Sequence, residues 1–325
     1  MPTPLRIATF NLENFDDTPN PPTLGTRVDL MQPELVRLRA DVLCLQEVNS
    51  QDDGAGGRNL RALDALLAGT PYAAYERVVT ADAHGMFLQE RNQVILSRFP
   101  VLAHEQIHDH ALAPSYRRVT AVPADAAAVT IDWERPILMA TVDLGGGRSL
   151  HVINLHLKSK LPTEIPGQKL NQFTWRTAAG AAEGSFVSSM KRVGQALETR
   201  LLVERLFDAD PHALIAVCGD FNSDITDVPV TAIRGDIADT GNAALADRVL
   251  LACERSVPEP SRFSLIHQGR GEMIDHILVS RGLLAGYEIT QVQNELVHDE
   301  SIAFATDVLY PESDHAAVVA SFVLP

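Results

Sequence analysis

Six short apolar runs in this 325-residue chain each carry a carboxylate, an amide or an imidazole at or near one end. They are IATFNLE, DVLCLQE, HVINLHLKS, AVCGDFNSD, MIDHILVS and ESDHAAVVASF. Their polar members are Asn11, Glu47, Asn154, His156, Asp220, Asn222, Asp275, Asp314 and His315. Because an unpaired buried charge is costly, a strand carries such groups where it leaves the core. The repeated pattern therefore predicts one pocket, rich in oxygen ligands, at one end of a stack of sheets.

The oxygen-bearing members of this set predict a site for a hard divalent cation. Carboxylate and amide oxygens suit Mg²⁺, Mn²⁺ or Ca²⁺, whereas Zn²⁺ would want more histidine or cysteine ligands. Mg²⁺ takes one or two carboxylates and fills its other positions with water and substrate phosphate. Asn11, Glu47 and Asp314 fit this sparse requirement as metal ligands. The expected cofactor is Mg²⁺ or Mn²⁺, with Ca²⁺ as an alternative.

The run that contains the first histidine predicts contacts with phosphate. In an extended HVINLHL segment, Asn154 and His156 point to the same face near the end of the strand. Lys158 follows at once and could also meet a phosphate. We therefore predict that Asn154, His156 and Lys158 face the substrate.

The second histidine needs a partner acid. Asp314 and His315 are adjacent, and in an extended chain they point to opposite sides, so the expected partner of His315 is Asp275. An aspartate beside an imidazole fixes its tautomer and stabilises the imidazolium. Acids and a histidine from separate segments could activate water and protonate a leaving oxygen while a metal polarises the phosphoryl group.

The elements that must position these residues are strands and helices in alternation. Apolar runs rich in Val, Ile and Leu predict strands buried on both faces. The expected strands cover 5–11, 41–47, 92–98, 136–143, 149–157, 213–219, 273–280 and 315–323. Leucines and valines at helical spacing predict helices over 27–40, 58–68 and 185–207, the last with Ser185 as its N-cap.

These elements predict a mixed α/β architecture in one domain. The glycines of LGGGRS at 144–149 indicate a turn between two strands, and strands that alternate with helices are typical of α/β folds. No repeat or linker divides the chain, so residues 1–325 are expected to form a single domain. The segments 159–184 and 294–313 are expected to be long loops, which in compact domains are often functional.

Composition limits the function classes. A net charge of −15 argues against a generally basic nucleic-acid-binding surface, but it allows a local basic groove. Three cysteines imply no disulfide framework, and Cys44 and Cys218 lie in apolar runs expected to be core. The N-terminus lacks the apolar stretch of a signal peptide, and no run is long enough to span a bilayer. A cytoplasmic protein is the default expectation, and the oligomeric state is left open.

Six runs in this order resemble the motifs of the endonuclease/exonuclease/phosphatase superfamily, from IATFNLENF to SDHAAVVASF. The superfamily includes pancreatic-type deoxyribonucleases, abasic-site endonucleases, bacterial sphingomyelinases and inositol polyphosphate 5-phosphatases. The resemblance implies a four-layered α/β sandwich, with two packed mixed β-sheets flanked by helices and the site at one end of the sheets.

The resemblance also implies roles for the matching residues. Asn11 and Glu47 resemble the metal-binding pair, and Asp314 resembles an additional metal-site acid. His156, in NLHLKS, resembles the phosphate-contacting histidine of the deoxyribonuclease and sphingomyelinase branches. Asp220 resembles the acid that orients or deprotonates the attacking water.

Five further positions also resemble functional residues of the superfamily, and two of them, Glu90 and Arg135, match only in their placement. Asn222 resembles the amide that binds the phosphate, and Asp275 with His315 resembles the Asp–His pair. Glu90, in QERNQVIL, is similar in placement to the acid that supports the first histidine. Arg135, in ERPIL, is similar to a phosphate-contacting arginine.

The implied activity is divalent-metal-dependent hydrolysis of a phosphodiester, with a nuclease as the leading interpretation. In it, Asp220 activates water while His156 and His315 assist. The presence of His156 disfavours the abasic-site branch, and the basic substrate motifs of the inositol phosphatases are not found. The alternative is a phosphatase or phospholipase-type enzyme acting on a small phosphate ester or lipid headgroup. A non-catalytic binding module is a distant third, since no metal or histidine position is missing.

Loops should discriminate between the two enzymes. A nuclease should have a basic, open groove, whereas a lipid enzyme should expose an apolar hairpin or an aromatic tip. The segment 159–184 holds residues that suit either function: Lys160, Lys169, Phe173, Trp175 and Arg176.

Overall fold

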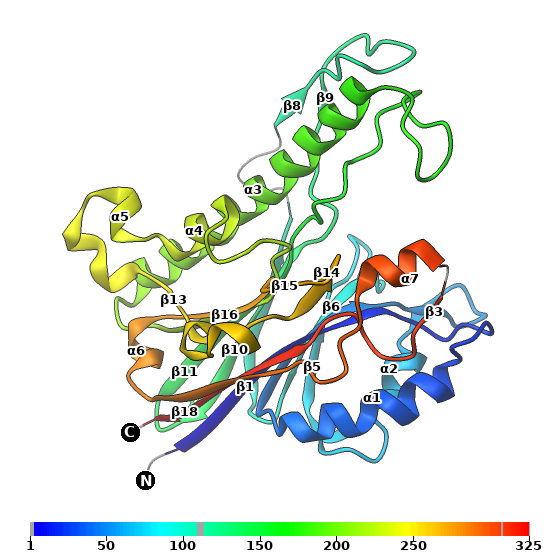
Figure 1. The fold of residues 1–325 in the computed structure, drawn as a ribbon. Coiled ribbons are helices and arrows are strands. Elements are labelled where there is room, and N and C mark those ends of the chain that lie inside the picture. Colours follow the sequence, from blue (N-terminus) through cyan, green and yellow to red (C-terminus); the bar gives the residue numbers. More distant parts are fainter. Residues whose placement is uncertain (1–2, 109–113, 307, 325) are drawn as a thin grey trace.

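Two six-stranded mixed sheets dominate the computed structural model, which describes residues 3–108, 114–306 and 308–324 (Figure 1). The first sheet has the spatial order β17 (Tyr287–Gln293), β18 (Ala317–Leu324), β1 (Thr3–Phe15), β2 (Val42–Val48), β6 (Asn92–Ser97) and β5 (Glu76–Val79). The second has the order β13 (Leu251–Ala252), β16 (Asp275–Val279), β12 (Leu214–Asp220), β11 (Arg148–His156), β10 (Ile137–Gly145) and β7 (Val101–Ile107). Each sheet has one parallel pair of neighbouring strands, which is β1 with β2 in the first sheet and β11 with β12 in the second. All other neighbouring strands in the two sheets are antiparallel.

The remaining elements are helices and short hairpins. The α-helices are α1 (Leu24–Leu38), α2 (Arg61–Leu67), α3 (Ala178–Ala209), α4 (Val228–Arg234), α5 (Ile237–Thr240), α6 (Arg281–Leu284) and α7 (Glu300–Thr306). The 3₁₀ turns are η1 (Pro71–Ala74), η2 (Ala243–Arg248), η3 (Cys253–Ser256) and η4 (Glu259–Ser261). The two-stranded pairs are β3 (Gln51–Asp52) with β4 (Arg58–Asn59), β8 (Ser115–Tyr116) with β9 (Val129–Thr130), and β14 (Leu265–His267) with β15 (Arg270–Glu272).

Three apolar clusters stack these elements into four layers. The central cluster joins the inner faces of the two sheets, for example Ile7 and Val318 of the first with Ala140 and Cys218 of the second. A second cluster packs the outer face of the first sheet against α1 and α2, and a third packs the outer face of the second sheet against α3 and α4. The predicted four-layered α/β sandwich is confirmed. That residues 1–325 form a single domain stays a prediction.

The predicted strands all exist, and the differences lie at element ends and sheet edges. The helix predicted at 185–207 begins earlier, at Ala178, and its N-cap is Thr177 rather than Ser185. The residues before Ser185 are mostly Ala and Gly, so no large apolar side chain marks the helical period there. The segment 294–313, predicted as a loop, contains α7. Edge strands such as β17 were missed because polar, exposed side chains interrupt their apolar pattern.

A projection beyond the sheets forms a fourth, smaller packing unit (Figure 1). We call residues 114–133 and 158–192 the arm, which comprises β8, β9, the segment after β11 and the first half of α3. The arm has its own apolar cluster around Trp133, Ile165 and Val187. Among the described residues, no helix combines the length and the apolar composition that crossing a membrane requires.

Candidate active site

One row of the second sheet brings three predicted residues together. Where β11, β12 and β16 lie side by side, His156 is paired in register with Asp220, and Asp220 with Asp275. Cross-strand neighbours place their side chains on the same face of a sheet. The row therefore concentrates one imidazole and two carboxylates at a single edge of the sandwich.

The first sheet supplies the opposite side of the site through a break in its regular pairing. The register between β1 and β2 shifts after Asn11, and Glu13, Asn14 and Glu47 have positive φ angles of 48°, 46° and 60°. Such backbone is uncommon for residues other than glycine and costs of order 1 kcal/mol at each position. The break turns Glu47 toward the site, where its Oε2 accepts the backbone N–H of Asn14 at 2.9 Å.

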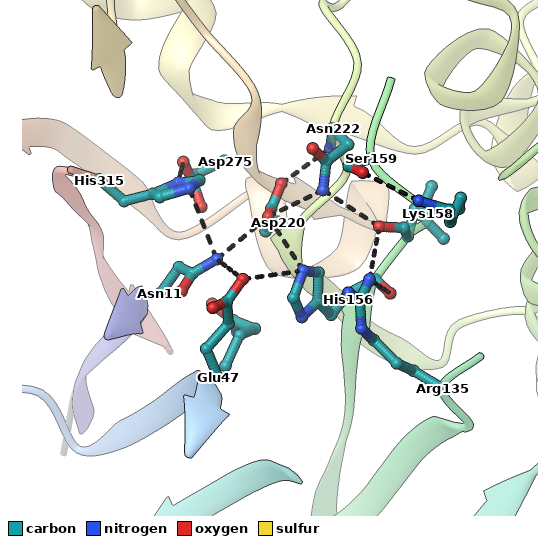
Figure 2. Close-up of polar contacts among 12 residues, drawn as sticks. Asn11, Glu47, Arg135, His156, Lys158, Ser159, Asp220, Asn222, Asp275 and His315 are labelled. Atoms are coloured by element: carbon teal, nitrogen blue, oxygen red, sulfur yellow. Dashed lines mark hydrogen bonds and ion pairs between the residues drawn. The ribbon is translucent and has the colours of Figure 1, made fainter. Parts of the chain in front are cut away.

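Asp220 lies at the centre of the site (Figure 2). Its Oδ2 accepts the amide N–H groups of Asn11 at 3.1 Å and Asn222 at 2.9 Å, and it lies 3.3 Å from His156 Nε2. Gly219 beside it has φ 137°, and a Cβ there would lie 2.0 Å from the carbonyl oxygen of Leu155. Only glycine therefore lets β11 and β12 approach closely enough to hold His156 against Asp220.

The second histidine has the partner predicted for it. His315 Nδ1 lies 2.7 Å from Asp275 Oδ2, and Asp275 is fully buried. Burial by itself would lower the pKa of His315, but the carboxylates of Asp275 and Asp314 outweigh it and raise that pKa well above its usual value. His315 is therefore an imidazolium that donates to Asp275.

The first histidine has the opposite electrostatics. Burial lowers the pKa of His156 well below its usual value, and the positive charges of Arg135 and His315 lower it further. Its Nε2 lies 3.4 Å from Glu47 Oε1 as well as beside Asp220, so the single proton of the neutral ring belongs on Nε2. Its Nδ1 is buried without a hydrogen-bond partner in the described part of the chain.

Several buried acids around this centre have raised pKa values. Burial raises the pKa of Asp220 to about 7, and neighbouring Asp275 and Glu47 add to the rise. Burial likewise raises the pKa of Asp314 to about 6 and that of Glu13 to about 8, where Asp314 contributes. A bound cation would stabilise the charged forms of these carboxylates.

The donor atoms suit a divalent metal ion. Potential ligand atoms form two groups, and within each group they lie within 4.8 Å of one another. One group is Glu47, His156 and Asp220, and the other is Asp220, Asp275 and His315. Asp275 Oδ1 and Asp314 Oδ1 are also buried without hydrogen-bond partners among the described residues. The residues present therefore fit a hard cation with mixed oxygen and imidazole ligands.

Two of the predicted metal ligands differ from expectation in detail. Asn11 presents its amide nitrogen to Glu47 and Asp220, while its Oδ1 accepts the backbone N–H of Glu13 at 2.9 Å. Coordination through Oδ1 would need a half-turn of the amide. Asp314 lies beside His315, at 3.8 Å between Oδ1 and Nε2, and belongs to neither of the two groups of ligand atoms.

The prediction that Asn154 contacts phosphate is wrong. The side chain is fully buried between the sheets, where it donates to the carbonyl oxygens of Leu45 and Val94, each at 3.0 Å. Its Oδ1 accepts the side-chain amide of Gln46 at 2.7 Å. Asn154 shares a face with His156, as predicted, but this face turns inward toward the first sheet, and only the last residue of the strand reaches the site.

The support of His156 by Glu90 is also not found. Among the described residues, exposed Glu90 makes no hydrogen bond or ion pair with His156. The next residue, Arg91, is half-buried and contributes positive charge to the surroundings of His156. Arg91 has φ 58°, and its Nε is buried without a hydrogen-bond partner in the described ranges. The turn at Arg91 directs the arginine, rather than the glutamate, toward the site.

The remaining phosphate-binding candidates lie at the end of β11. Arg135 is 5% exposed and donates from Nη1 to the carbonyl oxygens of His156 and Leu157, so it holds the strand end in place. Lys158 is half-buried and donates to Ser159 Oγ at 3.0 Å. Asn222 has φ 48° and donates from Nδ2 to both Leu157 and Asp220, so its amide is directed into the site (Figure 2).

The sequence pattern missed several residues that shape the site. Glu13 accepts the backbone N–H of Asp314 at 3.0 Å, and Ser313 Oγ donates to the carbonyl oxygen of Asn11 at 2.7 Å. Both were detectable in principle, because Glu13 lies two residues after Asn11 in NLENF and Ser313 lies two before His315 in SDH, the spacing of one strand face. Arg91 had no such signal, because a positive φ turns it.

Known proteins share this fold. The sequence model of the Endonuclease/Exonuclease/phosphatase family matches residues 8–315. A family protein from Bacteroides thetaiotaomicron has 16% identity and a TM-score of 0.60, over 100% of this chain and 96% of that chain. A truncated TDP2 from Caenorhabditis elegans has 17% identity and a TM-score of 0.56, over 98% of each chain. The 3′ phosphatase NExo from Neisseria, bound to a product DNA hairpin, has 19% identity and a TM-score of 0.52, over 98% of this chain and 99% of that chain.

No curated protein sequence matches the chain. The family match covers nearly all of it, and it includes the segments that carry Asn11, Glu47, His156, Asp220 and His315. Members of this family hydrolyse phosphate ester bonds and depend on divalent metal ions. The chain belongs to the endonuclease/exonuclease/phosphatase family.

Proposed function

We propose that this protein is a divalent-metal-dependent phosphodiesterase that cleaves nucleic acid. The observation that carries the hydrolytic part is the position of Asp220, which lies between the neutral His156 and the imidazolium of His315, itself paired with Asp275. One buried carboxylate thus lies between a neutral imidazole and an imidazolium.

A metal ion would be held by Glu47, with Asn11 and Asp314 able to add oxygen ligands. When bound, it would polarise the phosphoryl group and lower the pKa of a coordinated water. The oxygen-rich donor set favours Mg²⁺ or Mn²⁺, with Ca²⁺ as the alternative.

The residues of the chain divide the proton chemistry between them. Asp220, with a pKa of about 7, is poised to accept a proton from the attacking water near neutral pH. The imidazolium of His315, held by Asp275, can stabilise charge on the phosphoryl oxygens or protonate the leaving oxygen. His156 Nε2 supplies a neutral donor that can orient the phosphate, and the Asn222 amide holds the Asp220 carboxylate beside it.

The basic surroundings of the site support a polyanionic substrate. Arg91, Arg135 and Lys158 lie close enough to His156 for their positive charges to lower its pKa. The segment 158–192 then continues outward with six Lys or Arg residues against two Glu, a net charge of +4 in a chain of net charge −15. A chain of phosphates could contact the site and this segment together. The similar structures of NExo and TDP2 share the fold, and NExo was captured with a DNA hairpin.

The experiment is an activity panel with Mg²⁺ and Mn²⁺. The substrates are plasmid DNA, single-stranded DNA, RNA, sphingomyelin, inositol phosphates and bis-p-nitrophenyl phosphate. We expect cleavage of at least one polynucleotide, with a KM that rises steeply with salt as phosphate contacts release counterions. The variant Asp220→Asn should lose activity, and Asp125→Asn, on the arm, should keep it. Clear hydrolysis of a lipid or small ester without any nucleic-acid cleavage would reject the proposed substrate.

A lipid headgroup phosphodiesterase is the second candidate, and one observation favours it. The arm beside the site exposes large apolar side chains at its outer end. Both candidates use the same catalytic residues, so the substrate panel separates them.

A further inference from the structure

Another histidine–carboxylate pair lies on the opposite face of the strand that carries Asp275. His276 is the next residue of β16, so its side chain points to the outer face of the second sheet. There its Nδ1 lies 2.6 Å from Glu254 Oε1 of η3, and its Nε2 lies 2.8 Å from the carbonyl oxygen of Ser223. His276, Glu254 and Ser223 are all fully or almost fully buried, and none of them takes part in the hydrolysis described above.

The two partners of His276 hold the ring in one orientation. With Glu254 ionised, the carboxylate and the carbonyl group can only accept hydrogen bonds, so the ring donates from both nitrogens and is an imidazolium. The ring of Phe221 packs against it edge to face, with ring centroids 5.1 Å apart. His276 is therefore fixed between an acid on one side and a backbone carbonyl on the other.

Stability alone gives little reason for this buried pair. Removing two charges from water is costly, and apolar residues of similar volume often stabilise a fold as well or better. Apolar residues could not, however, donate a hydrogen bond to the Ser223 carbonyl oxygen. That hydrogen bond is the specific product of the pair, and it is the place to look for a function.

The hydrogen bond reaches a turn of the candidate site. Ser223 directly follows Asn222, which has a φ of 48°, and left-handed backbone of this kind costs free energy unless its surroundings hold it. The Asn222 backbone N–H donates to Asp220 Oδ1 at 2.8 Å, and its side-chain amide donates to Asp220 Oδ2 at 2.9 Å. The same amide also donates to the carbonyl oxygen of Leu157 at 3.0 Å. Leu157 thus anchors the side chain of Asn222, and His276 anchors the peptide group that follows it.

We propose that His276, held by Glu254, is a positioning residue that keeps the Asn222 turn, and through it the Asp220 carboxylate, in the geometry that hydrolysis requires. The inference rests on the catalytic role proposed for Asp220. An error of about 1 Å in the place of a reacting group can lower a rate on the order of 100-fold, so an anchor outside the site can matter as much as a group within it.

Two amide substitutions separate the two hydrogen bonds of His276. Counted along the side chain, the amide nitrogen of glutamine takes the place of Nε2, and that of asparagine takes the place of Nδ1. His276→Gln should therefore keep the donor to Ser223 and lose the donor to Glu254. His276→Asn should keep the donor to Glu254 and lose the donor to Ser223.

The two variants should rank in opposite order for activity and for stability. With bis-p-nitrophenyl phosphate, we expect kcat per folded molecule to fall roughly 10-fold to 100-fold in His276→Asn, at a nearly unchanged KM. It should recover most of the parent value in His276→Gln. Thermal melting should show His276→Gln to be the less stable of the two, because it leaves the buried carboxylate of Glu254 without its partner.

Hydrogen exchange provides a second measurement that needs no substrate. The Asn222 backbone N–H should lose protection in His276→Asn, relative to the slowest amides of the same variant, and should keep it in His276→Gln. Asn154→Ala is the matched control, because it removes buried hydrogen bonds elsewhere between the sheets. It should lower stability while kcat per folded molecule and the relative protection of Asn222 stay near the parent values.

The possible failures can be told apart. A parent-like kcat in His276→Asn, or rates in the two variants that follow their stabilities, would overturn the inference and leave the hydrolytic function in place. Full activity in Asp220→Asn would overturn the proposed function, and with it the effect expected on the rate. Hydrogen exchange would still decide whether His276 holds the turn, and unchanged relative protection of Asn222 in His276→Asn would reject that part as well.

Discussion

His315 and Asp275 come from different sheets and meet at the catalytic end of the sandwich. His315 precedes β18 in the first sheet, Asp275 begins β16 in the second, and Nδ1 lies 2.7 Å from Oδ2. The pair therefore ties the two sheets together where the acids gather, and the same contact fixes the charge state of the imidazole.

Replacing Asp275 should change the pH profile as well as the rate. Burial would lower the pKa of His315, and Asp275 is the main group that raises it. In Asp275→Asn the imidazolium should therefore lose its proton at a lower pH, so the alkaline limb of kcat/KM moves to lower pH. We expect kcat to fall on the order of 10²–10⁴-fold, the usual range for a general acid or base. A lower kcat/KM at every pH, with the alkaline limb at the same pH as in the parent protein, would show that Asp275 acts only in folding.

Metal dependence should be visible in both activity and stability. A chelator should abolish hydrolysis, and Mg²⁺ or Mn²⁺ should restore it. Because a ligand that binds only the folded state stabilises it, added Mg²⁺ should also raise Tm. Glu47→Gln should reduce both responses. An unchanged Tm response in Glu47→Gln would place the ion elsewhere.

Asn154→Ala should damage stability and leave the chemistry intact. The change removes the bonds to Gln46 and to two buried carbonyl oxygens. Buried groups left unsatisfied should lower the free energy of unfolding by on the order of 3 kcal/mol. Denaturant unfolding measures this loss, and kcat per folded molecule should stay near the parent value. His156→Ala is the comparison, because it should lose activity.

Glu34 should make the protein less stable as pH rises. Burial raises the pKa of Glu34 to about 7, above the 4.5 of an ordinary glutamate. The folded state therefore holds the proton of Glu34 more tightly than the unfolded state does. The stability that this proton contributes is fully present below about pH 4.5 and is lost as pH rises through about 7. Glu34→Gln should thus raise stability at pH 8 by on the order of 3 kcal/mol and have little effect at pH 4. An equal difference at both pH values would contradict the shift.

The sequence by itself determined the layered α/β class and picked out most of the residues that the structure brings together in the candidate site, because both follow from local patterns. Apolar runs of this length favour buried strands, and polar groups at their ends favour positions where the strands leave the core. Asn11, Glu47, His156, Asp220 and His315 were identified in this way, together with the Asp275 partner of His315.

The tertiary structure decided what each side chain faces. Alternation along β11 put Asn154 and His156 on one face, but only the packing of the two sheets placed Asn154 against Gln46 and left His156 at the edge. A positive φ at Arg91 reversed the expected roles of Glu90 and its neighbour. The Ala-rich and Gly-rich start of α3 has no periodic apolar face, so contacts with the rest of the arm define it. These features depend on residues far apart in the sequence, and a local pattern carries no record of them.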